Sequence, residues 1–415
     1  MKQTSSLGQD FAPMSLVNRI LWIGFAAYVA ILPVGATTAL RNLLFVIVLG
    51  ALGSMLWRTR EWPRVPVRLP WLALLLPALV SLTYSADLNY SLGELKTEIG
   101  VPFLIFAMTA TIVHDEQSFL RFLRILMAAN VFLVAFSLAT AVAGGTTKDD
   151  LVGTLNTGVG YYSTYLSAVM PFIALFLWRC KERGAKMVWA VSLLLVANLA
   201  SLYVSGNRQG LLAVLAELAV FVLIYRNRLT RKHWALIAMG GLSVCGLFLV
   251  QFLHRDASAA SGLGRAMSND VRWPVWHACI QALGDHPWTG SGFGLRIFQI
   301  AYPQFSANGP FWHAHNVLLN KGIQMGIPGI VGFLFLFFSI PWRMLRSLRL
   351  DCLVGATAAA GIAMSIGFLL KNMTDDFFYR ESGYVFWLLV GAVLGLCYGA
   401  NANANANANA ERSKE

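Results

Sequence analysis

Residues 313–329 read His-Ala-His-Asn-Val-Leu-Leu-Asn-Lys-Gly-Ile-Gln-Met-Gly-Ile-Pro-Gly, and here a long polar interval re-enters an apolar helix. The interval begins near residue 254 and is the only long polar stretch in an otherwise apolar chain. Apolar runs of about 20 residues, enough to cross roughly 30 Å of hydrocarbon, recur on both sides of it. The pattern predicts an all-α polytopic membrane protein whose reactive side chains gather in one loop.

Composition agrees with lipid as the solvent. Of the 415 residues, 57% are hydrophobic and 13% are charged, and the mean hydropathy is +0.60. The net charge of +12 does not indicate nucleic-acid binding, because the positive residues occupy short loops between apolar runs. The cysteines are widely scattered and indicate neither a disulfide framework nor a zinc site: Cys180, Cys245, Cys279, Cys352 and Cys397.

The hydrophobic pattern predicts about twelve transmembrane helices and one long periplasmic loop that itself contains helices. The first segment has no cleavage signature, so we expect a retained helix rather than a signal peptide. We place helices 1–9 within residues 1–253, the large loop at 254–314, helices 10–12 at 315–399 and a disordered cytoplasmic tail at 400–415. The expected spans are 19–33, 41–57, 70–84, 99–113, 119–143, 159–178, 187–204, 209–225, 233–253, 315–341, 352–371 and 383–399.

Arginine and lysine residues cluster in alternate loops, which predicts that these loops and both termini are cytoplasmic. The long loop then faces the opposite side of the membrane. A minority of cations falls on that side, where the insertion rule does not place them, so another reason must be sought. That minority includes Arg208, Arg265, Arg272, Arg296, Lys321, Lys371 and Arg380.

Two of these arginines stand at predicted helix starts. Arg208 lies in the short turn 205–210, and Arg272 lies in the first turn of a helix expected over 270–283. Free backbone N–H groups and the helix dipole favour an anion at such positions. Snorkelling of Arg208 to lipid headgroups is the alternative.

His315 opens the tenth predicted span, and Asn316 follows it. Gly326, Pro328 and Gly329 interrupt this helix, and broken helices at membrane depth occur where protein or a water-filled cavity lines them. We therefore expect a cavity beside His315, whose imidazole suits proton abstraction near neutral pH. A merely hydrogen-bonded interfacial histidine is the alternative. His313 should point elsewhere if helical, so the pair does not indicate a shared metal site.

Carboxylates add three further candidates, two aspartate pairs in loops and one glutamate in a predicted span. The pairs Asp149-Asp150 and Asp375-Asp376 fall in outer loops, where solvation or an ion pair is a more common role than metal binding. Glu217 lies inside the eighth predicted span. An intramembrane carboxylate indicates either a functional group or a structural hydrogen bond.

Four motifs together resemble the bacterial O-antigen ligase and polymerase family. They are 205–210 (Ser-Gly-Asn-Arg-Gln-Gly), 272–276 (Arg-Trp-Pro-Val-Trp), 287–292 (Pro-Trp-Thr-Gly-Ser-Gly) and 313–316 (His-Ala-His-Asn). The last is followed by Gly326 and Gly329, which is the spacing typical of the ligases.

The resemblance implies an inverting, metal-independent glycosyltransferase of the bacterial inner membrane that uses no cofactor and has a periplasmic active site. The donor would be a glycan linked to undecaprenyl pyrophosphate, and the acceptor would be the lipid A core oligosaccharide. His315 would be the catalytic base, with His313 and Asn316 in support. Arg208 and Arg272, which match family arginines, would bind the donor pyrophosphate, and we add Arg265 because it lies in the same long loop as Arg272.

Two other functions compete with this interpretation. A polymerase of the same family would join one lipid-linked glycan to another. A membrane transporter would account for the broken tenth helix and for Glu217. Against the transporter, the two halves of the chain show no internal repeat, and the reactive residues concentrate outside the membrane midplane.

Overall fold

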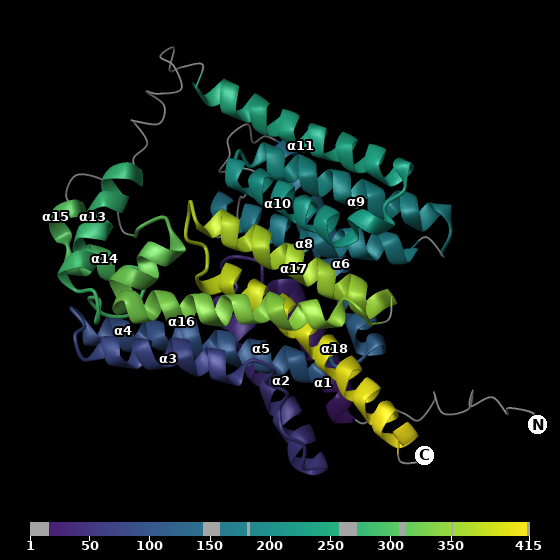
Figure 1. The fold of residues 1–415 in the computed structure, drawn as a ribbon, viewed down its shortest axis with the longest axis horizontal. Helices are drawn as coiled ribbons and strands as arrows, with labels where there is room; N and C mark the ends of the chain where they lie inside the picture. Colours follow the sequence, from purple (N-terminus) through teal and green to yellow (C-terminus); the bar gives the residue numbers. More distant parts are fainter. Residues whose placement is uncertain are drawn as a thin grey trace, which may run out of the picture.

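The computed structural model describes residues 16–143, 158–180, 183–256, 272–306, 313–350 and 352–412. All regular secondary structure in these ranges is helical (Figure 1). The elements are α1 (Leu16–Ile31), α2 (Thr38–Thr59), α3 (Arg68–Leu82), α4 (Leu88–Leu95), the π-helix η1 (Lys96–Gly100), α5 (Val101–Ile112), α6 (Glu116–Ala143), α8 (Val159–Cys180), α9 (Ala185–Val204), α10 (Arg208–Tyr225), the 3₁₀-helix η3 (Arg226–Arg228), α11 (Arg231–Asp256), α13 (Arg272–Asp285), α14 (Ile297–Ala301), α15 (Pro303–Ser306), α16 (Val317–Ser347), α17 (Cys352–Asn372) and α18 (Arg380–Arg412).

Nine helices within the described ranges are long and apolar enough to cross a membrane. Three further apolar segments, Leu16–Ile31, Arg68–Leu82 and Ile237–Gln251, coincide with predicted spans but are shorter. The all-α membrane fold is therefore confirmed. The count by length is nine rather than about twelve, because the three shorter segments fall below the roughly 20 residues that span a bilayer.

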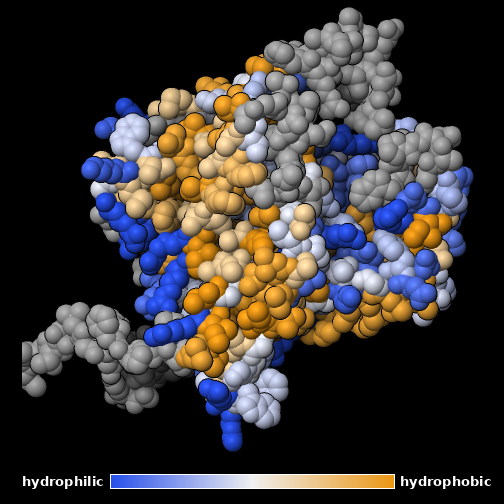
Figure 2. Space-filling view, turned by 180° about the vertical axis from the view of Figure 1, so that it is seen from behind, coloured by the Kyte–Doolittle hydropathy of each residue, from blue (hydrophilic) through white to orange (hydrophobic). Residues whose placement is uncertain are grey.

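The long helices pack side by side, and α13, α14 and α15 lie together at one end of the bundle (Figure 1). The closest partners are α18 with α5, α10 with α17, and α16 with α3. A broad apolar band crosses the face seen in Figure 2, and hydrophilic residues gather toward both ends of the bundle. Exposed apolar side chains such as Leu72 and Leu76 on α3 and Phe335 on α16 suit contact with lipid.

The break in α16 is sealed by protein. Gly326 has φ 67° and ψ −166° inside the helix. The turn 287–292 packs against it: the Ser291 N–H donates to the Ile323 carbonyl at 2.7 Å, and the Ile327 N–H donates to the Pro287 carbonyl at 2.7 Å. At the break itself the glycine-rich turn satisfies the freed backbone groups directly, so the break does not by itself require the cavity expected beside His315.

The loop 373–379, between α17 and α18, is held by two adjacent phenylalanines. The Phe378 ring lies among Phe333, Phe368 and Trp387, with centroid distances of 5.3 to 5.9 Å. The Phe377 ring meets Tyr161 of α8 edge to face at 5.1 Å. Aromatic packing therefore fixes the position of the carboxylates in this loop.

The C-terminal repeat differs from expectation. α18 continues to Arg412 and includes the alternating Asn and Ala residues 401–410, which sequence analysis assigns to a disordered tail. Ala is the strongest helix former, and a repeat that extends an existing helix needs no new nucleation. The structure corrects the prediction for this segment.

We predict that Gly326→Ala lowers the melting temperature of the protein in detergent. Its φ and ψ are accessible essentially only to glycine, and an added Cβ would lie 2.5 Å from the Pro287 carbonyl oxygen. Holding a residue with a Cβ in this backbone conformation costs roughly 1–3 kcal/mol. Gly50→Ala is the matched control, because a Cβ there meets nothing within 4 Å. Equal melting temperatures for the two variants would contradict the role of Gly326 in closing the break.

Candidate active site

The turn before α16 carries two histidines and the residue that caps the helix. The Asn316 side-chain oxygen accepts from the Leu318 and Leu319 N–H groups at 2.9 and 3.1 Å. The helix therefore begins at Val317, two residues later than the predicted span. His315 precedes the cap with φ 51°, a left-handed conformation that costs energy for a side chain with a Cβ. Such strain is often found at functional sites.

His315 and Asp375 form a hydrogen-bonded pair, with Nδ1 of the imidazole 2.9 Å from Oδ1 of the carboxylate. Burial acts to raise the pKa of Asp375, but the hydrogen bond from His315 and the charge of Lys371 outweigh it and hold this pKa below its usual value. An ionised carboxylate only accepts hydrogen bonds, so His315 donates from Nδ1. In the neutral imidazole, Nε2 then carries the lone pair that can accept a proton.

His313 lies beside His315 rather than pointing away from it. The two rings are 3.9 Å apart between centroids, and Nδ1 of His313 accepts from the His315 backbone N–H at 3.0 Å. The prediction that His313 points elsewhere is therefore wrong, because the residues form a turn and not a helix. Burial, together with the neighbouring His315, lowers the pKa of His313 to about 3. His313 is therefore neutral near pH 7.

The start of α16 is bound to the loop 373–379 at three points, of which the His315–Asp375 pair is one. Asn316 Nδ2 donates to the Met373 carbonyl at 2.9 Å. Asn320 Nδ2 donates to Asp376 Oδ2 at 2.6 Å, and Asn320 Oδ1 accepts from the Ala314 N–H at 2.8 Å. These three contacts orient the imidazole of His315 relative to both segments.

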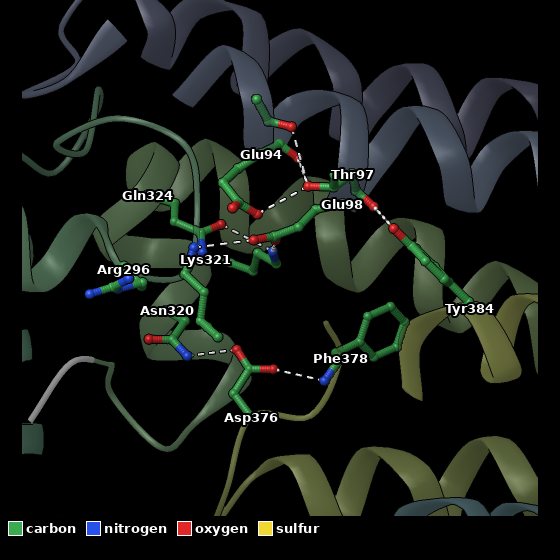
Figure 3. A network of polar contacts seen from close by, with 12 residues as sticks. Glu94, Thr97, Glu98, Arg296, Asn320, Lys321, Gln324, Asp376, Phe378 and Tyr384 are labelled. Carbon is green, nitrogen blue, oxygen red and sulfur yellow. Dashed lines mark hydrogen bonds and ion pairs between the residues drawn. The ribbon is translucent and has the colours of Figure 1, made fainter. Parts of the chain in front are cut away.

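Two further groups support this arrangement from outside. Trp276 Nε1 of α13 donates to the Ala314 carbonyl at 2.9 Å. On the other side, Lys321 of α16 forms a buried ion pair with Glu98 of η1 at 3.0 Å and contacts Gln324 at 3.0 Å (Figure 3). The π-helix η1 is a rare local distortion that often marks functional regions.

Three of these side chains could also hold a metal ion. One donor atom each from His313, His315 and Asp375 lies within 4.8 Å of the others. In the structure, however, Nδ1 of both histidines is already hydrogen-bonded. A metal ion would have to replace these bonds or use the Nε2 atoms, so the geometry favours the hydrogen-bonded pair over a metal centre.

The predicted arginines lie at helix starts, as expected. Arg208 is the first residue of α10, directly after Asn207, whose side chain accepts from the Gly210 N–H at 3.2 Å. Arg272 is the first residue of α13. Both side chains are half-buried. Arg265, like the pair Asp149-Asp150, lies outside the described residues.

Sequence reasoning did not identify Asp375 as a partner of His315. The two residues are far apart in the chain, and an aspartate pair in a loop has an ordinary interpretation as a solvated group. Glu217, the intramembrane carboxylate identified in the sequence, has no such partner in the part of the chain that the structure describes. It is buried beside Gly367 of α17, and neither of its oxygens has a hydrogen-bond partner within the described residues. The structural hydrogen bond weighed for Glu217 is therefore not observed.

The fold and site together describe an integral membrane protein with an Asp–His pair at the end of its bundle that carries α13–α15. Residues 193–334 match the family model described as O-Antigen ligase. This match over about a third of the chain supports a member of the O-antigen ligase family, a group of membrane glycosyltransferase-type enzymes of lipopolysaccharide synthesis. This confirms the resemblance seen in the sequence. The search among curated proteins found no match.

The matched segment covers part of the site. It includes Arg208, Arg272, His313, His315 and Asn316, and it ends within α16. Asp375 and the loop 373–379 lie beyond it. The pairing of His315 with Asp375 is therefore an observation of the structure and does not follow from the family match.

The low pKa of His313 predicts loss of stability in acid. In the unfolded chain this imidazole binds a proton below about pH 6.5, whereas in the folded protein it resists protonation until about pH 3. Protons bound only by the unfolded state favour unfolding, so stability falls as the pH drops from about 6.5 toward 3. We expect His313→Asn to show a smaller drop in melting temperature between pH 7 and pH 4.5 than the wild type.

His277→Asn is the matched control, since His277 is an exposed histidine of α13. It should retain the wild-type dependence on pH. If His313→Asn loses as much stability in acid as the wild-type protein does, His313 is not the group that makes the folded protein sensitive to acid.

Proposed function

We propose that this protein is an O-antigen ligase of the bacterial inner membrane. It transfers a glycan from undecaprenyl pyrophosphate to a hydroxyl of the lipid A core oligosaccharide, on the periplasmic side. The observation that carries the proposal is the 2.9 Å hydrogen bond between His315, in the 313–316 motif, and Asp375 of the loop 373–379. A histidine oriented by a carboxylate is the arrangement that activates a hydroxyl for attack.

In the proposed reaction, His315 Nε2 accepts the proton of the acceptor hydroxyl. The acceptor oxygen forms a bond to the anomeric carbon of the donor, from the face opposite to the pyrophosphate. The bond between that carbon and the pyrophosphate oxygen breaks, so the configuration inverts. Asp375 holds the imidazole in the required tautomer and stabilises its positive charge after proton transfer. The proton is later released from His315 to water.

Negative charge develops on the departing pyrophosphate, and guanidinium groups are suited to stabilise it. Arginine presents a planar fork of N–H donors that matches two phosphate oxygens at once. Arg208 and Arg272 both stand at helix N-termini, where backbone N–H groups add to this field. In this proposal they replace the divalent cation that many glycosyltransferases use. Arg265 assists them from the same long loop as Arg272.

The direct test is to incubate the purified protein with a lipid-linked glycan and a lipid A core acceptor. A conjugate of glycan and core supports the ligase. Elongation of the lipid-linked glycan without conjugate formation supports the polymerase instead. Absence of both products, with donor moved across a sealed vesicle, supports the transporter.

We predict that His315→Ala abolishes conjugate formation while the protein still folds, because His315 lies in a turn outside the packed core. Asp375→Asn should lower turnover by about a hundredfold or more, since the amide no longer fixes the imidazole tautomer. His313→Ala should be milder. Asp285→Asn, at an exposed aspartate ending α13, is the control. Half of normal turnover in His315→Ala would exclude the proposed base.

We predict that changing Arg208 or Arg272 to Lys lowers turnover substantially, because lysine keeps the charge but loses the planar fork. Alanine should cost more, on the order of 2–4 kcal/mol in transition-state stabilisation, or roughly a hundredfold or more in rate. Turnover and donor binding are measured in nanodiscs. Arg343, an exposed arginine near the C-terminus of α16, provides the control variants. Full activity in all four Lys and Ala variants is incompatible with a pyrophosphate clamp.

We predict that a chelator leaves turnover unchanged, because the proposed base and the arginines need no metal ion. The measurement is conjugate formation in EDTA, followed by addition of magnesium or manganese. Loss of activity that either metal restores would identify His313, His315 and Asp375 as a metal centre.

A further inference from the structure

A second cationic site adjoins the loop that holds Asp375. It is a cavity of about 460 Å³ lined by Tyr161, Arg296, Gln299, Tyr379 and Arg380. This volume lies within the roughly 300–1,000 Å³ typical of small-molecule pockets. Its walls come from the start of α8, from α14 and the residue before it, and from the start of α18. Neither Arg208 nor Arg272 lines it.

One of the two guanidinium groups that line the cavity, that of Arg296, is in no ion pair with a carboxylate of the described residues. Arg380 is 3.5 Å from Glu94, and Glu381 is occupied by Arg41 at 2.8 Å. Arg296 forms no ion pair within the described residues, and its guanidinium contacts the neutral Gln299 Oε1 at 3.4 Å. An anionic group is therefore the favoured ligand of this cavity.

The backbone holds Arg296 at the cavity and leaves its charge exposed. The Arg296 N–H donates to the Tyr90 hydroxyl at 2.9 Å. Gly294, with φ 120°, allows the turn to approach α4 so closely that a Cβ would lie 2.7 Å from the Tyr90 ring. Figure 3 shows the Arg296 guanidinium pointing away from the Lys321–Glu98 pair. The Arg296 guanidinium therefore makes no ion pair with the buried Lys321–Glu98 group.

Aromatic rings complete the walls. The Arg380 guanidinium lies 4.7 Å from the centroid of the Tyr379 ring, and the Tyr161 ring packs against Phe377. Tyrosine faces offer apolar area together with a hydroxyl, a combination that suits a sugar ring. Paired arginines and tyrosines therefore indicate a sugar that carries a negative charge.

The cavity is joined to the Asp–His pair through a single short loop. Arg380 follows Asp375 by five residues, and Phe377 between them contacts Tyr161. A ligand held by Arg380 and Tyr161 is therefore positioned against the segment that orients His315. Holding a hydroxyl nucleophile near its base is a large part of catalysis for such a transfer.

We propose that this cavity binds the acceptor glycan through an anionic substituent, a sugar phosphate or a sugar-acid carboxylate. The proposal rests on the proposed function, in which Arg208 and Arg272 bind the donor pyrophosphate. Arg296 and Arg380 then determine acceptor specificity and position the acceptor hydroxyl. They take no part in proton transfer.

The first test measures steady-state kinetics with a phosphorylated lipid A core acceptor. We expect Arg296→Gln and Arg380→Gln each to raise the acceptor KM roughly tenfold or more, the effect of losing a charged hydrogen bond. Both kcat and the donor KM should stay within about twofold. Arg380→Lys, which keeps the charge and the pairing with Glu94, should show a smaller rise in acceptor KM. Arg346→Gln, an exposed arginine in the last turn of α16, should match the wild type.

The acceptor is then altered instead of the protein. Removing its phosphates, or reducing its sugar-acid carboxylates, should raise the acceptor KM of the wild type by a similar factor. The acceptor KM of the two Gln variants should then change little further. The altered group that has this effect is the one bound. Three results would each overturn the proposal. The Arg variants could raise the donor KM, or they could leave the acceptor KM unchanged. The effect of altering the acceptor could also add in full to the effect of the Arg substitutions.

A binding measurement separates this proposal from the proposed function. The delipidated, phosphorylated core oligosaccharide is titrated into the wild type and the Arg variants in nanodiscs without donor. Weaker binding to Arg296→Gln and Arg380→Gln supports the cavity even if the wild type forms no conjugate, an outcome that would reject only the ligase reaction. Equal binding to wild type and variants rejects the cavity as the acceptor site.

Discussion

The site depends on the attachment of the first residues of α16 to the loop 373–379. His315, Asn316 and Asn320 contact Asp375, Met373 and Asp376 respectively, at 2.6 to 2.9 Å. Each bond joins segments about sixty residues apart, and all three are largely withdrawn from water. In such surroundings an unpaired polar group is costly, so the bonds act together to hold one geometry. The strained backbone of His315 is maintained by this set of contacts.

The surrounding helices make that attachment rigid. The Phe378 ring anchors the loop in an aromatic cluster, and the Lys321–Glu98 ion pair joins α16 to the π-helix η1. A buried ion pair is weak evidence for stability, but loss of either partner leaves an uncompensated charge. The glycine turn 287–292 closes the break in α16 by direct backbone bonds. The polar groups of the candidate active site thus lie at the end of the apolar bundle that carries α13–α15.

Sequence reasoning located half of the site. It identified His315, Asn316 and the two arginines at helix starts, because short motifs and helix-capping positions are local properties. It assigned Asp375 to an ordinary loop, and it expected His313 to point away from His315 if these residues were helical, whereas they form a turn. The cationic cavity could not be found either. Its residues Tyr161, Arg296 and Arg380 come from three separate parts of the chain, and no local pattern joins them.

The all-helical membrane class, the positions of the apolar helices and the resemblance to the O-antigen ligase family could all be predicted from the amino-acid sequence. These follow from composition, from hydrophobic runs of membrane length and from contiguous motifs, all of which are set by neighbours along the chain. The three-dimensional structure was needed to show which carboxylate orients His315, how the break in α16 is filled and where Arg296, which has no ion pair within the described residues, meets Arg380. Those features depend on the packing of α16 against the loop between α17 and α18, and contacts between distant segments leave no periodic signal in the sequence.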